Sequence, residues 1–560
     1  MSTEHPTINA APNETPAMFN HSWRFGDLCA AELLPVLQQH LIAKDSAANW
    51  QLVWLDNDDE PVIGLLPKVS WQLYFAPDSQ ATYQLMQTFR DDSMTSTVAN
   101  ITYEAWQQQL IDYCRDYEKV EKRRKKVAQT TSSSPRYHHG LIGFIGYDIA
   151  AQHLSPAVTM TNAESPLAAL GHYDIYLTRN VDNNINNKAN GTIWSLSCKS
   201  TDNSDKAIKD NHLEQLVSYL NALEHKLTKH GQEETLSEHK ELSQLYPLLT
   251  PLKLTPQWQK SDYKQAFAQT QHYLQQGDCY QINLTQAWQG QLASSANNDK
   301  NLTTTLSLMD YLPSLQRNTQ APFAGYMSVN SLNNDSLNQA DFELLSCSPE
   351  LFFTFSKDAD SDKHAITTKP IKGTMPRGIT TEEDATFKQQ LLSSDKDRAE
   401  NVMIVDLLRN DLGKYAKTGS VKVPQLFAIE SFSNVHHMVS TITAELKADT
   451  HPLAVLFGSL PAGSITGTPK RRAVEIISEL EIAPRGAYCG TMGYMNFDGS
   501  GQWNVLIRTL QAARLEDGSK SVRLWAGGGI TVASDVDAEY QECLDKVGNL
   551  LAVLAQADCS

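Results

Sequence analysis

The chain has 560 residues, more than one compact core usually holds, so we expect two domains or one large elaborated domain. Its net charge of −17 argues against nucleic acid or an anionic membrane as the main partner, and no apolar run reaches the roughly 18 residues of a membrane span. Eight cysteines without a C-x-x-C pair suit reduced thiols in a cytoplasmic protein and predict no zinc site.

The N-terminal half carries mixed signals. Residues 1–22 lack the basic and apolar pattern of a signal peptide, so we expect a disordered tail there. Strand-like runs such as WQLYF (71–75) and TIWSLS (192–197) alternate with helical patterns. The runs 118–135 and 180–191 are typical of loops or insertions, although the basic cluster in the first could also be a nucleic-acid patch.

A polar stretch, 228–256, is the best candidate for a domain boundary, which predicts an N-terminal domain over 23–250 and a C-terminal domain over 255–558. In the second domain, amphipathic or apolar patterns predict helices over 261–277, 397–415, 468–481 and 537–556. Strands are expected within 280–288, 343–355, 364–371, 488–497, 503–515 and 522–532. Blocks of helix between antiparallel-looking strands predict an α+β fold, not a doubly wound parallel sheet.

Carboxylates on two predicted helices could hold a metal ion. Glu539, Glu542 and Lys546 stand at i, i+3 and i+7 and share one face of the last helix, while Glu400 lies beside an apolar run. Two or three carboxylates without His or Cys are what Mg²⁺ takes while keeping water for a substrate. The alternatives are a solvated charged face on the last helix and an ion pair between Glu400 and Lys396.

Glycine clusters and one arginine could bind anions. In AGGGI (526–530) three successive glycines would let backbone N–H groups approach a carboxylate, and in AGSITGTPK (462–470) Ser464 precedes a helix N-terminus that favours an anion. Loops need glycine for other reasons, so each cluster alone is a weak signal. Arg508 is a stronger signal, because a guanidinium on the apolar strand NVLIRTL needs an anionic partner.

Three further features could act on a substrate. Of the adjacent His436 and His437, which would point to opposite faces of a strand, one could serve as an acid or a hydrogen-bond donor. Glu350 follows a Ser-Pro pair on a strand-like run, where burial would raise its pKa toward a proton-donating role. Lys372 in TTKPIKGTMPRG would end an extended run before a tight turn, and a surface lysine is the ordinary interpretation of such a residue.

Nine motifs occur in one order: SPE, PIKGTMPRG, AENVMIVDLLRNDLG, VHHMVSTITAEL, AGSITGTPKRRAVEII, RGAYCGTMGY, IRTL, AGGGI and AEYQECLDK. This series resembles the chorismate-utilising enzymes, which include anthranilate synthase component I, the isochorismate and salicylate synthases and aminodeoxychorismate synthase component I. The resemblance covers residues 255–555 closely, and HHGLIGFIGYDIA (138–150) more loosely resembles the family's N-terminal glycine-rich segment. It implies two antiparallel sheets packed face to face with helices outside, built from both halves of the chain.

The resemblance gives Lys372 a role. Most members read P-I-A-G-T where this chain reads PIKGT, and the lysine marks the branch of ammonia-dependent transferases that make 4-amino-4-deoxychorismate for 4-aminobenzoate and folate synthesis. The amine would add to the ring carbon next to the carboxylate-bearing one and drive out the C4 hydroxyl; ammonia would then attack C4 and expel the lysine. Attack requires a neutral amine, which desolvation or a neighbouring cation would favour. The alternative within the family is an anthranilate synthase component I of tryptophan synthesis.

The resemblance also implies the other roles. Glu350 would be the general acid for the leaving hydroxyl, and His437 would assist it. Glu400 and Glu542 would hold Mg²⁺, with Glu539 as a further or water-mediated ligand. The substrate would be bound by Arg508, Tyr488, the N–H groups of Gly528 and Gly529, Ser464 and Lys546.

Ammonia would come from a partner. The chain shows no G-x-C-x-G elbow with a downstream H-x-E, so the resemblance implies a separate glutamine amidotransferase subunit, with this chain a monomer or one half of a heterodimer. Some related enzymes bind tryptophan through an L-L-E-S-type stretch, from which IGLLPKVSW (63–71) departs, so an effector site is left open. The alternative from another class is a catalytically silent chorismate-binding partner, against which the presence of all the proposed reacting side chains speaks.

Overall fold

The structure is a computed structural model of the chain and describes most of residues 21–556. Outside the described residues lie 1–20, 27, 45–49, 77–81, 91–94, 125–135, 159–164, 181–191, 200–205, 231–248, 293, 297–302, 306, 331–340, 359–362, 433–434 and 557–560. The predicted tail lies there except for His21 and Ser22, which belong to a strand. Most of the two predicted insertions and of the predicted domain boundary also lies there.

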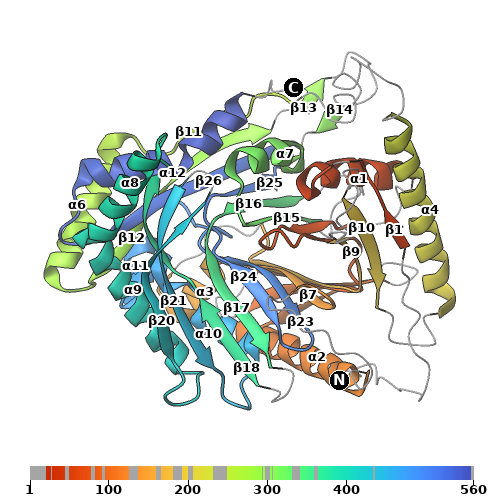
Figure 1. Cartoon of the computed structure of the whole chain (residues 1–560), viewed down its shortest axis with the longest axis horizontal. Coiled ribbons are helices and arrows are strands. Elements are labelled where there is room, and N and C mark those ends of the chain that lie inside the picture. The colour runs from red at the N-terminus through yellow and green to blue at the C-terminus, as the bar shows by residue number, and fades with distance from the viewer. Residues whose placement is uncertain are drawn as a thin grey trace.

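Two sheets of 12 strands each form the centre of the molecule, and their paired strands run antiparallel (Figure 1). The first sheet is, in order, β1 (His21–Trp23), β10 (Ile193–Cys198), β9 (Ile175–Asn180), β3 (Val62–Gly64), β2 (Val53–Leu55), β15 (Phe323–Val329), β16 (Phe342–Ser348), β25 (Thr509–Arg514), β26 (Lys520–Ile530), β12 (Gln281–Leu292) and β11 (Thr255–Pro256), with β22 (Gly467–Thr468) beside β12. The second is β19 (Ile371–Pro376), β21 (Val435–Glu445), β18 (His364–Thr368), β17 (Leu351–Lys357), β24 (Gly501–Asn504), β23 (Thr491–Asn496), β7 (Gly140–Ile145), β8 (Ala168–Tyr173), β4 (Val69–Phe75), β5 (Tyr83–Phe89) and β6 (Ser96–Ile101), with β20 (Lys422–Ser431) beside β21.

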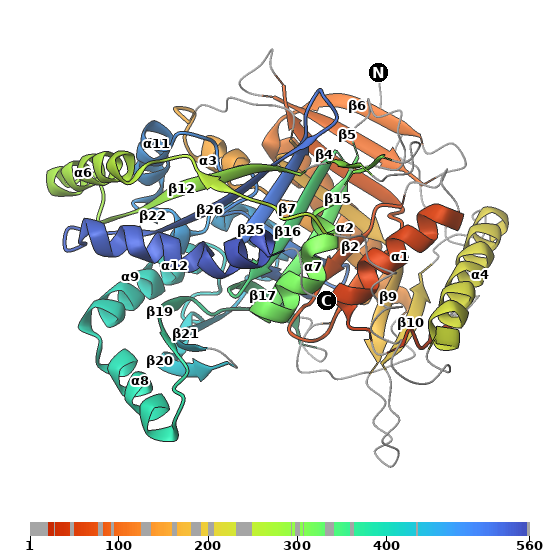
Figure 2. The same cartoon turned by 90° about the horizontal axis from the view of Figure 1, so that it is seen from above.

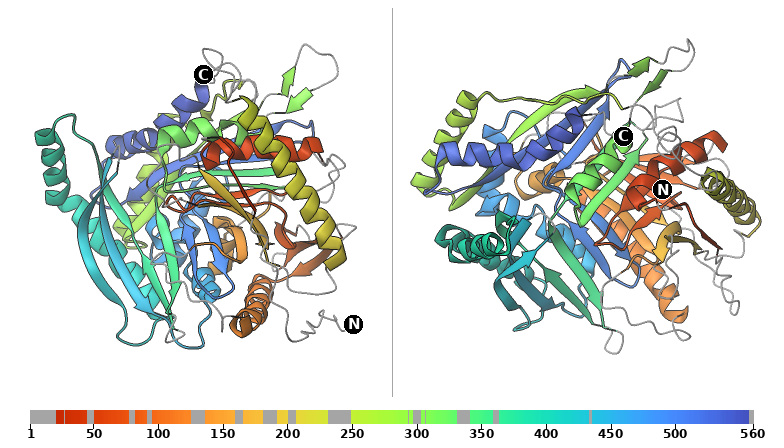
Figure 3. Two further views of the ribbon diagram at one scale, coloured as in Figure 1. Left: turned by 45° about the vertical axis from the view of Figure 1, so that its right-hand side comes forward. Right: turned by 45° about the horizontal axis from the view of Figure 1, so that its top comes forward.

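Helices cover the outer faces of both sheets (Figures 2 and 3). The apolar core outside the first sheet includes side chains of α1 (Ala30–Lys44), α4 (Lys206–His230), α6 (Lys260–Gln276), α7 (Leu308–Thr319) and α12 (Val536–Ala555). The core outside the second sheet includes side chains of α2 (Tyr103–Arg124), α3 (Tyr147–Leu154), α9 (Asp395–Gly413) and α10 (Pro452–Ser459), and α11 (Lys470–Leu480) contributes to both. A third core joins the two sheets, because it contains β15 and β16 residues together with β7 and β23 residues. The expected arrangement of two face-packed antiparallel sheets with helices outside is therefore confirmed.

The two halves of the chain share both sheets. β2 pairs with β15 in the first sheet, and β7 pairs with β23 in the second. The second join needs glycine, since a Cβ on Gly140 would lie 2.0 Å from the carbonyl oxygen of Met495. The remaining elements are the small hairpin of β13 (Ser294–Ala296) and β14 (Thr303–Thr305), the 3-10 turn η2 (Gly463–Ile465), and α8 (Thr381–Ser393), which projects from the molecule beside α9 (Figure 2).

Two predicted strands prove to be broken. The run 343–355 forms β16 in the first sheet and β17 in the second, and the run 503–515 forms β24 in the second sheet and β25 in the first. Each break is a point at which the chain crosses between the packed sheets, as strands at the corners of a sandwich do. Strand-like residues flank each crossing on both sides, which explains why the sequence predicts one strand in each run.

Candidate active site

The two crossings place the first pair of side chains. Glu350 lies in the crossing from β16 to β17, and Arg508 lies in the return crossing from β24 to β25. The crossings bond to each other, because the Val505 N–H donates to the Glu350 carbonyl at 3.0 Å and the Cys347 N–H donates to the Arg508 carbonyl at 3.0 Å. Arg508 is thus not a strand residue as predicted; it has a left-handed backbone with φ of 51°.

Glu350 titrates far above an ordinary glutamate. Its residue is 8% exposed, and this burial raises the pKa of Glu350 to about 7. Lys372 is the largest influence in the opposite direction, followed by Lys546, a hydrogen bond with Ser464 and the charge of Arg508. A carboxyl with this pKa is about half protonated at neutral pH, so it can donate a proton to a leaving group.

A β-bulge carries Lys372. The register between β19 and β21 shifts by one residue between Ile371 and Thr374, and Gly373 inside the bulge has φ of 79°. Bulges bend a strand and redirect a side chain, and glycine adopts this backbone without strain. Lys372 therefore stands near the start of a strand that continues beyond it, whereas the sequence predicts the end of a strand before a turn.

Three lysines neutralise the three carboxylates that the sequence assigns to a metal ion. The pairs are Lys372–Glu400 at 3.9 Å, Lys396–Glu539 at 3.4 Å and Lys546–Glu542 at 2.7 Å. The alternative pairing of Glu400 with its neighbour Lys396 on the same helix is not the one observed, because Lys396 bonds across to α12. β19 of the second sheet, α9 and α12 therefore bring these side chains to one place.

The carboxylates fit an Mg²⁺ ion whose remaining ligands would be oxygen atoms of the substrate and of water. Burial raises the pKa of Glu400; Lys372 and Lys396 act against it, and Glu539 and Glu542 raise it further. In the described part of the chain no three His, Cys, Asp or Glu side chains lie close enough to hold a metal ion alone. One or two carboxylates completed by substrate and water oxygens suit Mg²⁺, whereas a closed protein cage does not exist here.

Gly528 makes the space in front of two of these carboxylates. A Cβ on Gly528 would lie 3.0 Å from Oε2 of Glu539 and 3.6 Å from Oε1 of Glu542. The AGGGI motif lies inside β26, not after a strand as predicted, and β25 pairs with β26 only as far as Leu524. One edge of the glycine run thus has no strand partner among the described residues, and a carboxylate could reach backbone N–H groups from that edge.

The two histidines point to opposite faces of β21, as adjacent strand residues must. Nε2 of His436 lies 2.9 Å from Oδ1 of Asp384 on α8, so this histidine faces α8. The ring of His437 lies 2.8 Å from Oγ1 of Thr374 through Nδ1. Burial, then the charges of Arg508 and His436, lower the pKa of His437 to about 4. His437 is therefore neutral at pH 7 and can act as a hydrogen-bonding group but not as an acid.

Ser464 precedes α11 in the chain, and Tyr488 follows it. Ser464 belongs to the turn η2, and it lowers the pKa of Glu350, so this turn lies beside the sheet crossing. Tyr488 is buried, and its ring stacks on Trp525 with the ring centroids 5.8 Å apart. Pro469 lies just outside α11, whereas the sequence predicts it within the first turn.

Gln281 is a residue of the site that the sequence reasoning missed. It is 1% exposed, and neither amide atom has a hydrogen-bond partner among the described residues. Its Nε2 would lie 2.4 Å from a Cβ on Gly529, so the amide occupies the space that this glycine leaves. A buried amide without partners offers a donor and an acceptor to a ligand. The signal was the alternation of Gln281, Asn283 and Thr285 with apolar residues in a strand whose two faces are both buried.

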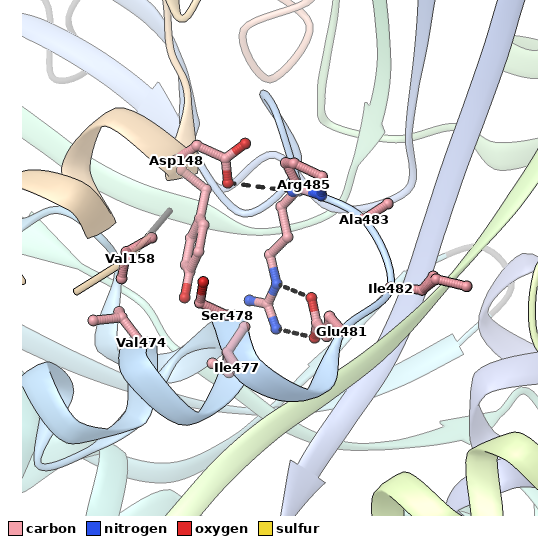
Figure 4. Close-up of a pocket in the computed structure, with 11 residues that line it drawn as sticks. Asp148, Val158, Val474, Ile477, Ser478, Glu481, Ile482, Ala483 and Arg485 are labelled. Atoms are coloured by element: carbon pink, nitrogen blue, oxygen red, sulfur yellow. Dashed lines mark hydrogen bonds and ion pairs between the residues drawn. The ribbon is translucent and has the colours of Figure 1, made fainter. Parts of the chain in front are cut away.

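A pocket of about 220 Å³ between α3 and α11 includes none of the predicted site residues (Figure 4). Arg485 beside it donates to both oxygens of Glu481 and to the backbone carbonyls of Asn283 and Ile465. Asp148 accepts from the Arg485 N–H at 3.2 Å. These bonds tie β12 to the turn that carries Ser464, so we assign this region a supporting role.

Comparisons with known proteins agree with the fold. A profile of the family described as chorismate binding enzyme matches residues 75–552. The anthranilate synthase component I of Streptococcus pneumoniae superposes with a TM-score of 0.59 at 21% identity, covering 88% of this chain and 91% of that one. MenF, the menaquinone-specific isochorismate synthase of Escherichia coli, superposes with a TM-score of 0.56 at 16% identity, covering 97% and 95%. No helix in the described ranges is long and apolar enough to cross a membrane.

Curated relatives match part of the chain. The aminodeoxychorismate synthase component 1 of Salmonella typhimurium is 42% identical over 313 residues, which are 55% of this chain and 62% of that protein. The Escherichia coli protein of the same name is 43% identical over 307 residues, 54% and 60% respectively. The anthranilate synthase component 1 of Synechocystis is 40% identical over 237 residues, 42% and 46%. This chain thus spans less than two thirds of the length of these relatives.

Proposed function

This chain belongs to the chorismate binding enzyme family, and we propose that it converts chorismate and ammonia into 4-amino-4-deoxychorismate. The observation that carries the proposal is the placement of Lys372, whose Nζ lies 3.9 Å from Oε2 of Glu400 and whose charge acts on Glu350. An amine between a proton donor and a carboxylate that would hold the metal ion can attack the ring of a substrate bound beside it. The relatives named aminodeoxychorismate synthase support this assignment.

The first step forms a covalent bond between the protein and the ring. The neutral amine of Lys372 adds to the ring carbon next to the carboxylate-bearing carbon. The double bonds shift, the C4–O bond breaks, and Glu350 supplies the proton with which the hydroxyl leaves as water. As the new C–N bond forms the amine loses a proton, which restores the one that Glu350 gave to the leaving hydroxyl, so the ring is attached through a secondary amine. His437, being neutral, can hold the departing oxygen by a hydrogen bond.

The second step releases the lysine. Ammonia attacks C4, the double bonds shift back, and the bond between the ring and Lys372 breaks. The amino group then stands where the hydroxyl was, and the lysine is regenerated after proton transfer to its nitrogen. Two allylic displacements thus replace one awkward substitution, which is the general advantage of covalent catalysis.

The remaining side chains hold the dianionic substrate. Arg508, half-buried in the sheet crossing, suits one carboxylate, and an N–H group at the free edge of the Gly528–Gly529 run can add a hydrogen bond to it. We assign Mg²⁺ to Glu400 and Glu542, with Glu539 beside them. When bound, the ion neutralises the ring carboxylate and orients the ring. Ser464 and Lys546, which both lower the pKa of Glu350, would line the ring pocket.

A glutamine amidotransferase subunit would supply the ammonia. The relatives carry the name component 1, which implies a second component. Free ammonium should replace that subunit in vitro. The partner, the monomeric or heterodimeric state and a cytoplasmic location follow from the family and stay predictions.

Product analysis tests the proposal. The chain is incubated with chorismate, Mg²⁺ and ammonium, and the product is separated chromatographically. We expect 4-amino-4-deoxychorismate, and Lys372→Ala should form none. Lys369→Ala, which removes a lysine three residues earlier on an exposed ion pair with Glu430, is the matched control and should keep activity.

The anthranilate synthase assignment is tested in the same experiment. The Synechocystis relative of that name is nearly as similar over a shorter region, which makes it the second candidate. Fluorescent anthranilate appearing directly from chorismate and ammonium would establish that activity and would overturn the present proposal.

A further inference from the structure

Lys396 places a cation among the carboxylates assigned to Mg²⁺. It stands in the first turn of α9, one helical turn before Glu400, yet its ammonium crosses to α12 and lies 3.4 Å from Oε1 of Glu539. Its side chain is 59% exposed, whereas that of Glu539 is 2% exposed. The ion pair therefore joins a flexible lysine side chain, most of which lies in solvent, to a buried carboxylate.

Glu539 depends on a cation more than its neighbours do. Within the described part of the chain, its one other side-chain hydrogen bond comes from the Ser534 hydroxyl, which donates to the same Oε1 at 2.8 Å. The second oxygen, Oε2, faces the space in front of Gly528. A buried carboxylate without a positive charge beside it is strongly unfavourable, so a metal-free protein without Lys396 would leave Glu539 uncompensated.

We propose that Lys396 is a built-in competitor of the metal ion. Its ammonium neutralises Glu539 in the metal-free protein and leaves Glu539 when a divalent cation binds to the same group of carboxylates. Lys372 and Lys546 differ from Lys396, because their charges are among the main influences on the pKa of Glu350. Lys396 is not among these influences, so we place it outside the reacting group. The exposed stem of Lys396 allows it to swing into solvent.

This proposal rests on the proposed Mg²⁺ site, and it predicts in which direction the Mg²⁺ affinity changes when Lys396 is removed. A competitor lowers metal affinity, so its removal must tighten metal binding. A lysine that merely props Glu539 in place while the metal is bound would have the opposite effect. The sign of the change therefore separates the two roles.

Calorimetric titration of the full chain with Mg²⁺ alone, in the absence of chorismate, measures this sign. We expect Lys396→Met and Lys396→Gln to bind Mg²⁺ about fivefold more tightly than the wild type. The matched control is Lys264→Met, since Lys264 pairs with Asp537 of the same helix at 3.1 Å and is 44% exposed. The control should change the affinity by less than about twofold.

Thermal unfolding gives a second readout that needs no activity. In EDTA both Lys396 variants should unfold at a lower temperature than the wild type, and Mg²⁺ should raise their unfolding temperature by more than it raises that of the wild type. Equal or weaker Mg²⁺ binding by both variants, with the wild type binding normally, would overturn the role of Lys396 alone. A wild-type protein that binds no Mg²⁺, either alone or in the presence of chorismate, would overturn the metal site of the proposed function as well.

Discussion

Replacing Glu350 by glutamine should stabilise the protein at alkaline pH while removing most of its activity. Burial raises the pKa of Glu350 to about 7 in the folded chain, against 4.5 for an ordinary glutamate. Between these values the folded state binds more protons than the unfolded state, so stability falls as the pH rises through this window. The difference, 7 − 4.5 = 2.5 units, corresponds to about 3 kcal/mol of lost stability above pH 7.

Glutamine is neutral at every pH and so removes this loss. Differential scanning fluorimetry of Glu350→Gln and wild type at pH 5 and pH 8 measures the effect. For a chain of this length, about 3 kcal/mol corresponds to a rise in unfolding temperature of roughly 2–3 °C at pH 8, with most of the gain absent at pH 5. The same temperature difference at both pH values would refute the assignment of a raised pKa to this carboxyl.

The activity of the same variant should move in the opposite direction. Wild-type turnover should fall as the pH rises above about 7, because the protonated form of Glu350 donates the proton to the leaving hydroxyl. Glu350→Gln should turn over about 10²–10⁴ times more slowly and should lack this alkaline decline. A variant that kept the decline would show that another group is the acid.

Two further substitutions test the surroundings of the site, and a third tests a buried ion pair between β16 and β26. Gln281→Leu removes a buried amide without partners, so it should raise stability by about 1–3 kcal/mol in a denaturant titration while it lowers turnover, and unchanged turnover would remove Gln281 from the site. Gly373→Ala forces a side chain onto φ of 79°, so it should cost about 1–2 kcal/mol and reduce turnover more than tenfold by displacing Lys372; normal kinetics would mean that the bulge is unimportant. Lys520→Met leaves the fully buried Glu343 without its cation and should lower stability by about 3–5 kcal/mol, whereas loss of the exposed Lys264 should cost less than about 1 kcal/mol; equal effects would contradict the importance of burial.

The fold class followed from the sequence because it depends on signals that persist over many residues. Blocks of helix between antiparallel-looking strands were enough to predict α+β, and the order of nine motifs was enough to predict two packed sheets. The crossings at Glu350 and Arg508 were not predictable in the same way. Val505 and Leu506 are apolar residues that join β24 to β25 without a turn signal, so the change of sheet is decided by distant pairing partners and not by local propensity.

The candidate site was predicted residue by residue but not in its pairings. Motif order alone indicated that Lys372, Glu400 and Glu542 act together. It did not indicate that Lys396 would leave its helical neighbour for Glu539, because that choice depends on how α9 and α12 pack. Local spacing favours the i, i+4 pair within a helix, and tertiary packing overrides it here.

Gln281 was overlooked for a related reason. A glutamine in a strand is ordinary when that strand faces water, and its meaning changes only when both faces of β12 are known to be covered. Sequence patterns show one covered face readily, because period-two alternation reveals it. They do not show what covers the polar face, so a buried amide without partners becomes visible only in the structure.

Intact-mass spectrometry of the protein with chorismate tests the central claim most directly. With Mg²⁺ present and ammonia withheld, the wild type should gain the mass of chorismate less one water, the adduct should map to the peptide that contains Lys372, and added ammonium should discharge it. Lys369→Ala should form the same adduct and Lys372→Ala none. A Lys372→Ala protein that still made 4-amino-4-deoxychorismate at the wild-type rate would contradict the account.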